Sequence, residues 1–321
     1  MELPAMALQS ELKQDKFPSS DVPVKDKTKK ITWVRVWNST DIFHIILVGG
    51  LHVLCLSAPF TFSWSAFWLS LTLYAVCGVF GTTLSYHRNL THRSFKLPKY
   101  LEYFFAYVGL HALQGDPVWW VSTHRYHHKF TDTYLDPHSP IEGFWFSHIF
   151  WLFDSKYILE ECGRYENAGD LLKQSYYRFL ERTFVFHVYL QAALLYMFGG
   201  FPFIVWGMAV RTVWGFHASW LVNSVCHRYG HQAWDTGDLS TNNWFIAMLT
   251  SGEGWHNNHH AFEYSARHGI EWWQIDTTWY VIKLLEYLGL ATDVKVPSEV
   301  HKRKMSFKNC VQDKQFCVND K

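Results

Sequence analysis

The chain has 321 residues, of which 49% are hydrophobic and 18% aromatic, and its formal net charge at pH 7 is +1. This composition is sufficient for a large core and indicates a globular or membrane-embedded protein, and the near-neutral charge gives no reason to expect a nucleic-acid partner. The six cysteines are scattered without a CxxC pair, so the sequence indicates neither a zinc-thiolate site nor a disulfide framework.

The two ends of the chain are more polar than the middle. Residues 1–31 mix acidic and basic side chains, so they resemble neither a signal peptide nor an acid-poor transit peptide, and we expect a disordered tail. Residues 299–321 are also polar, which favours a second, C-terminal tail. The domain between these tails spans residues 32–298.

The first apolar stretch is long enough for two membrane spans. From Ile42 to His87 the chain has 46 consecutive residues without Asp, Glu, Lys or Arg. A helix needs about 20 residues to cross roughly 30 Å of hydrocarbon, so this stretch predicts spans at about 42–60 and 64–86. Pro59 breaks the helix between them and marks a short turn.

A second hairpin is predicted further along the chain. Residues 183–210 contain no Asp, Glu, Lys or Arg, and Gly200 and Pro202 mark a turn within them. The predicted spans are 183–200 and 202–224. Arg211 lies inside the last of these, where a charge is costly, so we expect that helix to project from the bilayer into a cytosolic domain.

Basic residues indicate how the spans are oriented. Five of them lie shortly before the first span: Lys25, Lys27, Lys29, Lys30 and Arg35. By the positive-inside rule the N-terminus faces the cytosol, and the chain returns there after two spans and again after four. The sequence therefore predicts an all-α membrane protein with four transmembrane helices in two hairpins, a cytosolic helical catalytic domain and both termini in the cytosol.

A soluble protein with very apolar buried helices is the alternative. His44, His52 and Arg211 within the apolar stretches favour it. We prefer the membrane interpretation, because 46 uncharged residues exceed what a buried helix needs.

Histidines supply the most specific pattern in the chain. The motif HxxHH occurs at residues 124–128 and 256–260, and each copy places three imidazoles on one helix face at positions i, i+3 and i+4. His87 and His92 are five residues apart, which does not fit one face of a regular helix, so we expect a helix end or a distortion there. With His227 these residues offer nine imidazoles, enough for two metal ions. Imidazole suits zinc, copper, iron and nickel, so ligand type alone does not select the metal.

Four segments contain these nine histidines. They are His87-Arg88-Asn89-Leu90-Thr91-His92, His124-Arg125-Tyr126-His127-His128, Asn223-Ser224-Val225-Cys226-His227 and Gly252-Glu253-Gly254-Trp255-His256-Asn257-Asn258-His259-His260. Together they resemble the histidine boxes of membrane fatty-acyl desaturases, particularly the stearoyl-CoA desaturase-like Δ9 group and its plant acyl-lipid members. The resemblance covers roughly Thr32 to Ser298 and implies a multi-pass protein of the endoplasmic reticulum membrane with its active site in the cytosol.

The resemblance also implies which residues bind two Fe2+ ions. One ion would be held by His87, His92, His124, His128 and His259. The other would be held by His127, His227, His256 and His260. Asn223 would reach this second ion through a water molecule, and its position four residues before His227 permits that role. An amide that only satisfies the backbone near a helix end is the simpler alternative for Asn223.

Further residues are candidates for supporting roles. Asp132, Asp136 and Glu253 lie near the boxes and are candidates to orient ligand imidazoles, with plain surface charge as the alternative. Trp220, two turns before His227, and Ala75 and Val79, about three and two turns before His87, are candidates to line an acyl tunnel. Packing or lipid contact is the alternative role for each of these three residues.

The implied reaction removes two vicinal hydrogens from a saturated acyl chain while O2 is reduced to water. The chain has no GxGxxG fingerprint and no evident haem domain, so two electrons must come from outside, and the resemblance implies cytochrome b5 with its reductase. Animal acyl-CoA enzymes carry basic side chains where this chain has Ser122-Thr123 and Ile141-Glu142. The missing charges favour an acyl chain of a membrane lipid over acyl-CoA, which remains the alternative.

The sequence thus predicts a di-iron, oxygen-dependent desaturase that introduces a cis double bond, at Δ9, into saturated fatty acyl chains. Two alternatives remain open. One is a histidine-box lipid hydroxylase or ketolase, which would share the metal chemistry. The other is a membrane metal transporter, although a transporter should place its ligands within the spans, whereas these histidines follow them.

Overall fold

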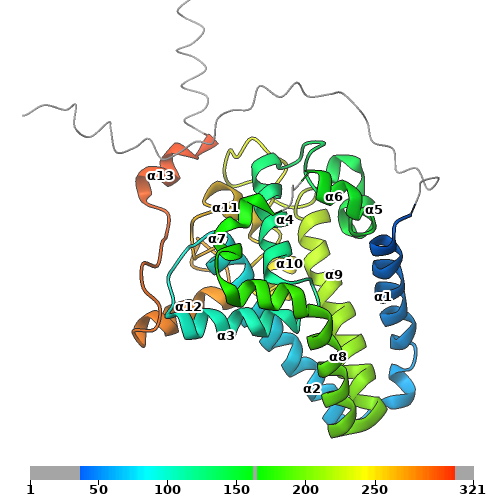
Figure 1. Cartoon of the computed structure of the whole chain (residues 1–321). Coiled ribbons are helices and arrows are strands. Elements are labelled where there is room, and N and C mark those ends of the chain that lie inside the picture. Colours follow the sequence, from blue (N-terminus) through cyan, green and yellow to red (C-terminus); the bar gives the residue numbers. More distant parts are fainter. Residues whose placement is uncertain (1–36, 162–164, 308–321) are drawn as a thin grey trace, which may run out of the picture.

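A computed structural model describes residues 37–161 and 165–307 (Figure 1). Within these ranges the chain forms helices and three isolated bridges but no β-strand, in agreement with the predicted all-α class. The tail predicted for residues 1–31 lies outside the described residues, as do the basic residues used to orient the spans. The start of the predicted C-terminal tail forms a short helix, α13 (Glu299–Lys304), whose first turn is capped by the Ser298 hydroxyl.

The first predicted hairpin is present as two helices joined by a short turn. Helix α1 (Ser39–Cys55) begins with an Asn38 capping box, and the turn contains the 3-10 segment η1 (Ala58–Thr61) with Pro59 in its first turn. Helix α2 (Trp64–Ala75) continues without a break into a π-helix, η2 (Val76–Thr91). The combined stretch Trp64–Thr91 is 28 residues long and apolar enough to cross a membrane, whereas α1 is shorter.

The second predicted hairpin also turns where its glycines are. Helix α8 (Ser175–Ile204) is followed by the π-helix η6 (Val205–Val210) and by α9 (Arg211–Ser224), and together they form a second apolar helical stretch of 50 residues. Gly200 interrupts this stretch with φ +63° and ψ −154°, a backbone conformation open almost only to glycine. Leu195 packs against Gly207 beyond the turn, so the chain reverses direction at Gly200.

The remaining helices include α4 and α11, which carry the two HxxHH motifs. They are α3 (Lys99–Leu110), α4 (Pro117–Phe130), α5 (Phe144–His148), α6 (Ser155–Glu161), α7 (Gly169–Leu172), α10 (Trp244–Leu249), α11 (His256–Ala261) and α12 (Thr277–Tyr287). Figure 1 shows α2, α8 and α9 extending away from α4, α10 and α11, while α3 and α12 lie across the other helices.

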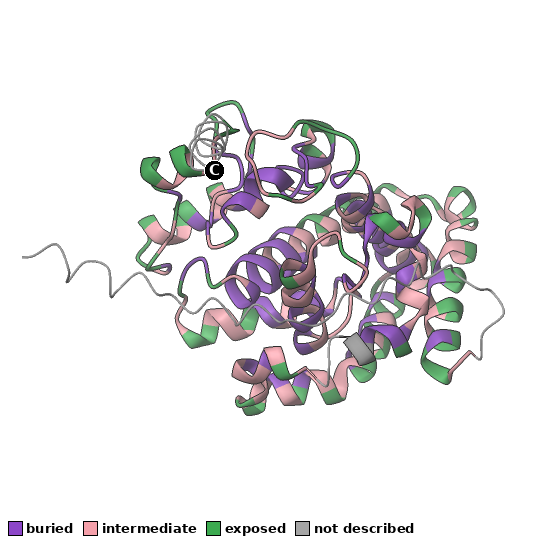
Figure 2. Ribbon diagram, turned by 90° about the horizontal axis from the view of Figure 1, so that it is seen from above, coloured by how far each residue is buried: buried purple, intermediate pink, exposed green. Residues whose placement is uncertain are grey.

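The most tightly packed crossing joins η2 to α3. A Cβ on Gly81 would lie 2.6 Å from Gly109 Cα, so these two helices touch backbone to backbone. Tyr86 and Leu110, both nearly inaccessible to solvent, extend this contact toward α4. Buried residues concentrate in these central helices and exposed residues on the outer ones (Figure 2). The segment that carries His87 is therefore fixed in a rigid core.

Candidate metal centre

The structure brings all nine histidines together and divides them into two groups. Within each group the ring nitrogens lie within 4.8 Å of one another. The five-histidine group contains His87, His92, His124, His128 and His259. The four-histidine group contains His127, His227, His256 and His260. This is the same division that the resemblance implies, and both groups are largely buried.

Local helix geometry explains how these side chains converge. His124, His127 and His128 lie on α4, and the second HxxHH motif begins α11, so each motif projects its imidazoles from one helix face. His92 ends the π-helix η2, and its backbone N–H donates to the His87 carbonyl at 3.2 Å. This i→i+5 bond brings two histidines five residues apart onto one side. The predicted distortion between them is confirmed.

The Nε2 atoms of the ligand candidates face one another at short distances. His259 Nε2 lies 2.8 Å from His128 Nε2 and 3.1 Å from His87 Nε2. In the four-histidine group, His256 Nε2 lies 2.9 Å from His227 Nε2 and 3.1 Å from His260 Nε2. Nitrogens that bind one metal ion at about 2.1 Å and at right angles lie about 3 Å apart, so the spacing fits a shared cation.

Carboxylates fix the protonation of five of the nine rings. In each case a carboxylate oxygen faces Nδ1, at distances of 2.6 to 3.3 Å; the pairs are Glu253–His87, Glu263–His128, Asp136–His127, Asp132–His227 and Asp238–His260. A neutral imidazole has a single N–H, and a carboxylate retains it at Nδ1. The Nε2 atoms of these rings are then unprotonated, and their lone pairs face the lone pairs of neighbouring rings. This arrangement is repulsive, and a cation bound between the rings would relieve the repulsion.

Three of these carboxylates belong to the residues predicted from the sequence. Asp132, Asp136 and Glu253 each contact a ligand candidate rather than lying on the surface as unpaired charges. Asp238 and Glu263 were missed. Glu263 lies three residues after the second HxxHH motif, so nearness to a motif would have included it, whereas Asp238 lies on a loop 22 residues before His260 and gave no sequence signal.

Burial and partners set the charge state of the site. Burial lowers the pKa of His260 to about 4, even though Asp238 opposes the shift, and it lowers the pKa of His256 and His259 well below the ordinary value. Burial acts to raise the pKa of Glu253, but the facing His87 and Arg88 hold it well below its ordinary value. These shifts favour neutral imidazoles at His256, His259 and His260 and an ionised Glu253, the states in which such groups bind or support a metal ion.

Arg88 connects this centre to α12. Its side chain is fully buried, and its Nη2 lies 2.9 Å from Glu253 Oε1 and 2.9 Å from Asp276 Oδ1. Asp276 caps α12 by accepting from Trp279 N. Glu253 is therefore held between Arg88 on one oxygen and His87 on the other. This arrangement fixes the orientation of the His87 ring.

Two histidines that were not expected to bind metal lie beside the two groups. His268 lies near His87 and Glu253, and its Nδ1 is 3.3 Å from Glu253 Oε2. His138 lies near His127 and Asp136, and its Nδ1 is 3.6 Å from Asp136 Oδ1. His268 and His138 therefore each lie beside a carboxylate that also faces a ligand candidate. The sequence did not indicate this proximity.

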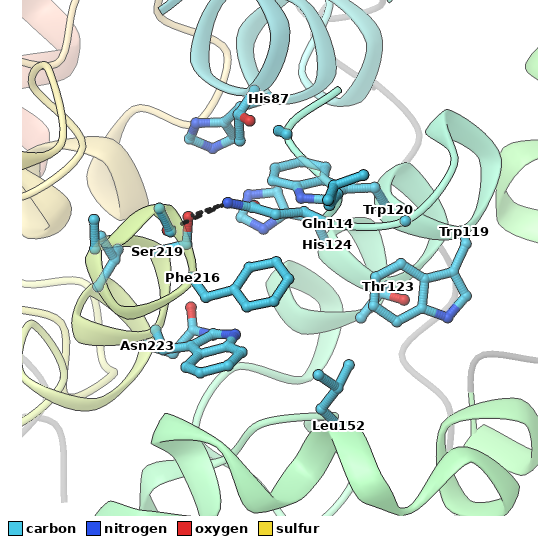
Figure 3. Close-up of a pocket in the computed structure, with 18 of the residues that line it drawn as sticks. His87, Gln114, Trp119, Trp120, Thr123, His124, Leu152, Phe216, Ser219 and Asn223 are labelled. Carbon is cyan, nitrogen blue, oxygen red and sulfur yellow. Dashed lines mark hydrogen bonds between the residues drawn. The ribbon is translucent and has the colours of Figure 1, made fainter. Parts of the chain in front are cut away.

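A cavity of about 410 Å³ lies next to the histidines, a size in the range of small-molecule sites. His87, His124, His127 and His256 border it, and so does Asn223 (Figure 3). Gln114 Nε2 donates to Ser219 Oγ at 2.8 Å within this lining. The cavity gives a bound molecule direct access to both histidine groups.

The predicted tunnel residues do not all reach this cavity. Trp220 and Ala75 line it, whereas Val79 is absent from the lining, which contains Gly78 and Thr82 instead. The prediction for Val79 counted 3.6 residues per turn back from His87. The intervening segment is π-helical and takes more residues per turn, so a different set of side chains faces the cavity.

The family follows from a comparison of the whole chain. A family model described as "Fatty acid desaturase" matches residues 62–292, which include both histidine groups. The chain belongs to the fatty acid desaturase family. The predicted recognition is therefore confirmed, and the desaturase is an oxidoreductase of lipid metabolism with a histidine cluster able to bind metal.

Individual relatives differ in substrate and in double-bond position. The "Acyl-CoA C20 Delta5-desaturase" of Anemone leveillei is 84% identical over 96% of this chain and 100% of its own length. The "Palmitoyl-monogalactosyldiacylglycerol delta-7 desaturase, chloroplastic" of Arabidopsis thaliana is 59% identical over 90% of this chain and 78% of its own. The "Delta-9 acyl-lipid desaturase 1" of the same plant is 52% identical over 94% and 99%. Desaturation is common to all three, whereas the Δ9 position is not.

Proposed function

We propose that this desaturase is a di-iron, O2-dependent enzyme that introduces a cis double bond at the Δ5 position of saturated C20 acyl chains carried by coenzyme A. The convergence of Nε2 lone pairs in two buried histidine groups supports the metal assignment. The 84% identity to a relative with a C20 Δ5 name supports this substrate and position. The Δ9 position predicted from the sequence is the second candidate, supported by the relative with a Δ9 name.

The proposed ligands are the five- and four-histidine groups, with Asn223 bound through water to the four-histidine ion. When bound, the two iron ions would supply the oxidising power for removal of two hydrogens. The chain itself does the positioning. In this proposal the acyl chain occupies the cavity that His87, His124, His127 and His256 border.

The carboxylates have a distinct part in this proposal. Asp136 and Glu253 accept from Nδ1 of His127 and His87, which would keep the Nε2 lone pairs available to bound ions. Because both carboxylates are buried, they fix the ring orientations when substrate enters and leaves. The protein thus holds the ligands in one tautomer and one direction throughout the reaction.

We further propose that four helical spans, α1, α2 with η2, and the two legs of the Gly200 hairpin, cross the endoplasmic reticulum membrane with the histidine groups on the cytosolic side. Cytochrome b5 with its reductase supplies the two electrons that the reaction needs. The apolar length of Trp64–Thr91 and Ser175–Ser224 supports the membrane assignment. Electron supply by cytochrome b5 follows from the resemblance of the histidine boxes.

The test is expression in a yeast that lacks its own Δ9 desaturase and is supplied with C20 saturated fatty acid, followed by mass spectrometry of double-bond positions. New C20 monoenes with a Δ5 bond, absent from the His127→Ala variant, are the expected result. Monoenes with a Δ9 bond would replace the proposed position and keep the enzyme class. Hydroxylated products would favour the hydroxylase alternative, and membrane-inserted protein without iron would favour the transporter.

A further inference from the structure

One face of α9 lines the cavity. Arg211, Gly215, Ser219 and Asn223 all line the cavity at intervals of four residues, and the next step of four is His227 in the four-histidine group. Within α9, Arg211 lies twelve residues before Asn223, or about 18 Å at 1.5 Å per residue, and His227 follows beyond the end of the helix. Of the four α9 residues that line the cavity, Arg211 therefore lies farthest along the helix from the metal centre.

Side chains from η2 and from the loop after α3 surround Arg211 there. Cys77 and Leu113 line the cavity, and Cys77 lies near the guanidinium. The loop after α3 is tied to α9 twice, by Arg211 Nη1 donating to the His111 carbonyl and by Gln114 donating to Ser219. This loop therefore holds the guanidinium in place beside the cavity.

The Arg211 side chain is only 3% exposed, and part of its hydrogen-bonding capacity is unused. Its Nε donates to the Gly207 carbonyl at 3.0 Å and its Nη1 to His111, whereas Nη2 is buried and has no partner in residues 37–161 and 165–307. No carboxylate of these residues forms an ion pair with it. A buried cationic donor without an acceptor is costly, and the cost is greatest among apolar surroundings. An oxygen atom that accepts a hydrogen bond from Nη2 would remove this cost.

We propose that Arg211 makes the deep end of the acyl cavity an oxygen-binding site. A water molecule occupies it when the acyl chain ends in methyl, and a terminal hydroxyl of a suitable chain replaces that water. The site also limits chain length, because a longer hydrocarbon chain must displace the water and leave Nη2 without an acceptor. Arg211 is thus a specificity-determining residue. The inference rests on the proposed function, because it concerns the acyl chain that the desaturase binds.

The first experiment uses the wild-type desaturase with pairs of acyl-CoA substrates of equal length, one ending in methyl and the other in a primary hydroxyl, from roughly sixteen to twenty-two carbons. At the length that reaches Arg211, the hydroxyl-ended chain should be desaturated with a kcat/KM equal to or above that of its methyl-ended partner. An apolar cavity end would bury the hydroxyl without an acceptor or donor and reject it by about tenfold or more at every length. That second result overturns the inference while leaving desaturation intact.

The second experiment uses Arg211→Met, which removes the donors and retains a long side chain. This variant should lose the advantage of the hydroxyl-ended chain and should raise, by about tenfold, the ratio of products longer than the wild-type optimum to products of that optimum. Arg211→Lys keeps a buried donor and should retain the wild-type ratio. Arg182→Met makes the same exchange on an exposed residue of α8 and is the control.

The outcomes separate the two proposals. If wild-type protein with bound iron desaturates none of the methyl-ended chains, the proposed function fails and the inference fails with it. If it desaturates them and the Arg211→Met product ratio is unchanged, only the inference fails. Should Arg211→Met not accumulate in membranes, the wild-type comparison of hydroxyl- and methyl-ended chains decides alone.

Discussion

Asp238 offers the sharpest test of how the carboxylates support the metal centre. Its Oδ1 accepts from Ser240 N at 2.9 Å, from Ser240 Oγ at 2.5 Å and from Thr236 Oγ1 at 2.6 Å, while Oδ2 faces His260 Nδ1 at 3.1 Å. In Asp238→Asn the amide oxygen must remain at Oδ1, where these donors converge. The amide NH2 then faces His260 Nδ1 and favours the tautomer with its proton on Nε2, which cannot bind metal.

The expected magnitude follows from known effects of such partners. Loss of a carboxylate that orients a ligand histidine weakens metal affinity by about 10- to 100-fold, which corresponds to roughly 1.4 to 2.8 kcal/mol. Because His260 belongs only to the four-histidine group, iron content should fall from two ions per chain toward one. Titration of apo-protein with Fe2+ and metal analysis of the purified variant measure both quantities.

Asp235→Asn is the matched control, because Asp235 lies on the same loop and its backbone N–H, not its carboxylate, makes the bond to Met305. It should bind iron as the wild type does. Two tightly bound ions in Asp238→Asn would refute the tautomer argument. Loss of both ions would show instead that the loop supports the whole centre.

Three further outcomes are expected. Gly78 lines the cavity, and a Cβ added there would meet no atom within 4 Å. Gly78→Leu should therefore fill part of the cavity and shift the products in a fatty-acid profile to shorter chains, whereas Val79→Leu should not. Equal effects of the two variants would contradict the π-helical register. Gly200→Ala should cost about 1–3 kcal/mol because of its positive φ, seen as a lower Tm in detergent, and an unchanged Tm would place the turn elsewhere. The apo-protein should lose stability as pH falls from 6.5 to about 4, because over this range His260 binds a proton in the unfolded chain but stays neutral in the folded protein. Denaturant titrations that show constant stability over this range would contradict the lowered pKa of His260.

Sequence periodicity predicted those features that depend on local chain chemistry. The turns at Pro59 and Gly200 follow from the backbone limits of proline and glycine, and the structure confirms both. The HxxHH spacing predicted convergent imidazoles, because helical faces repeat every three to four residues. The distortion between His87 and His92 was predicted for the same reason, since their spacing violates that repeat.

The sequence could not supply features that depend on long-range packing. The histidine spacing predicted a distortion near His87 but not that it extends over a π-helix of sixteen residues. Because of this π-helix, Val79 does not line the cavity. Asp238 reaches His260 only because a loop folds back over α11, which no spacing indicates. Arg211 was recognised as a costly charge, but its carbonyl partners come from Gly207 and from His111, a hundred residues away.

The two HxxHH motifs divide their histidines between the two groups, and this limits how independent two bound ions would be. On α4, His124 and His128 serve one group and His127 the other, and on α11, His259 serves one group while His256 and His260 serve the other. A tautomer change acts on one ring and therefore on one ion, but any shift of either helix moves ligands of both. Two buried asparagines between the ligands of α11, Asn257 and Asn258, reduce such shifts. Asn257 Oδ1 accepts from the backbone N–H groups of Ala233 and Trp234. Asn258 Nδ2 donates to the His268 carbonyl and to the Gln274 side chain. The residues between the metal-binding positions thus hold the backbone of α11 in place.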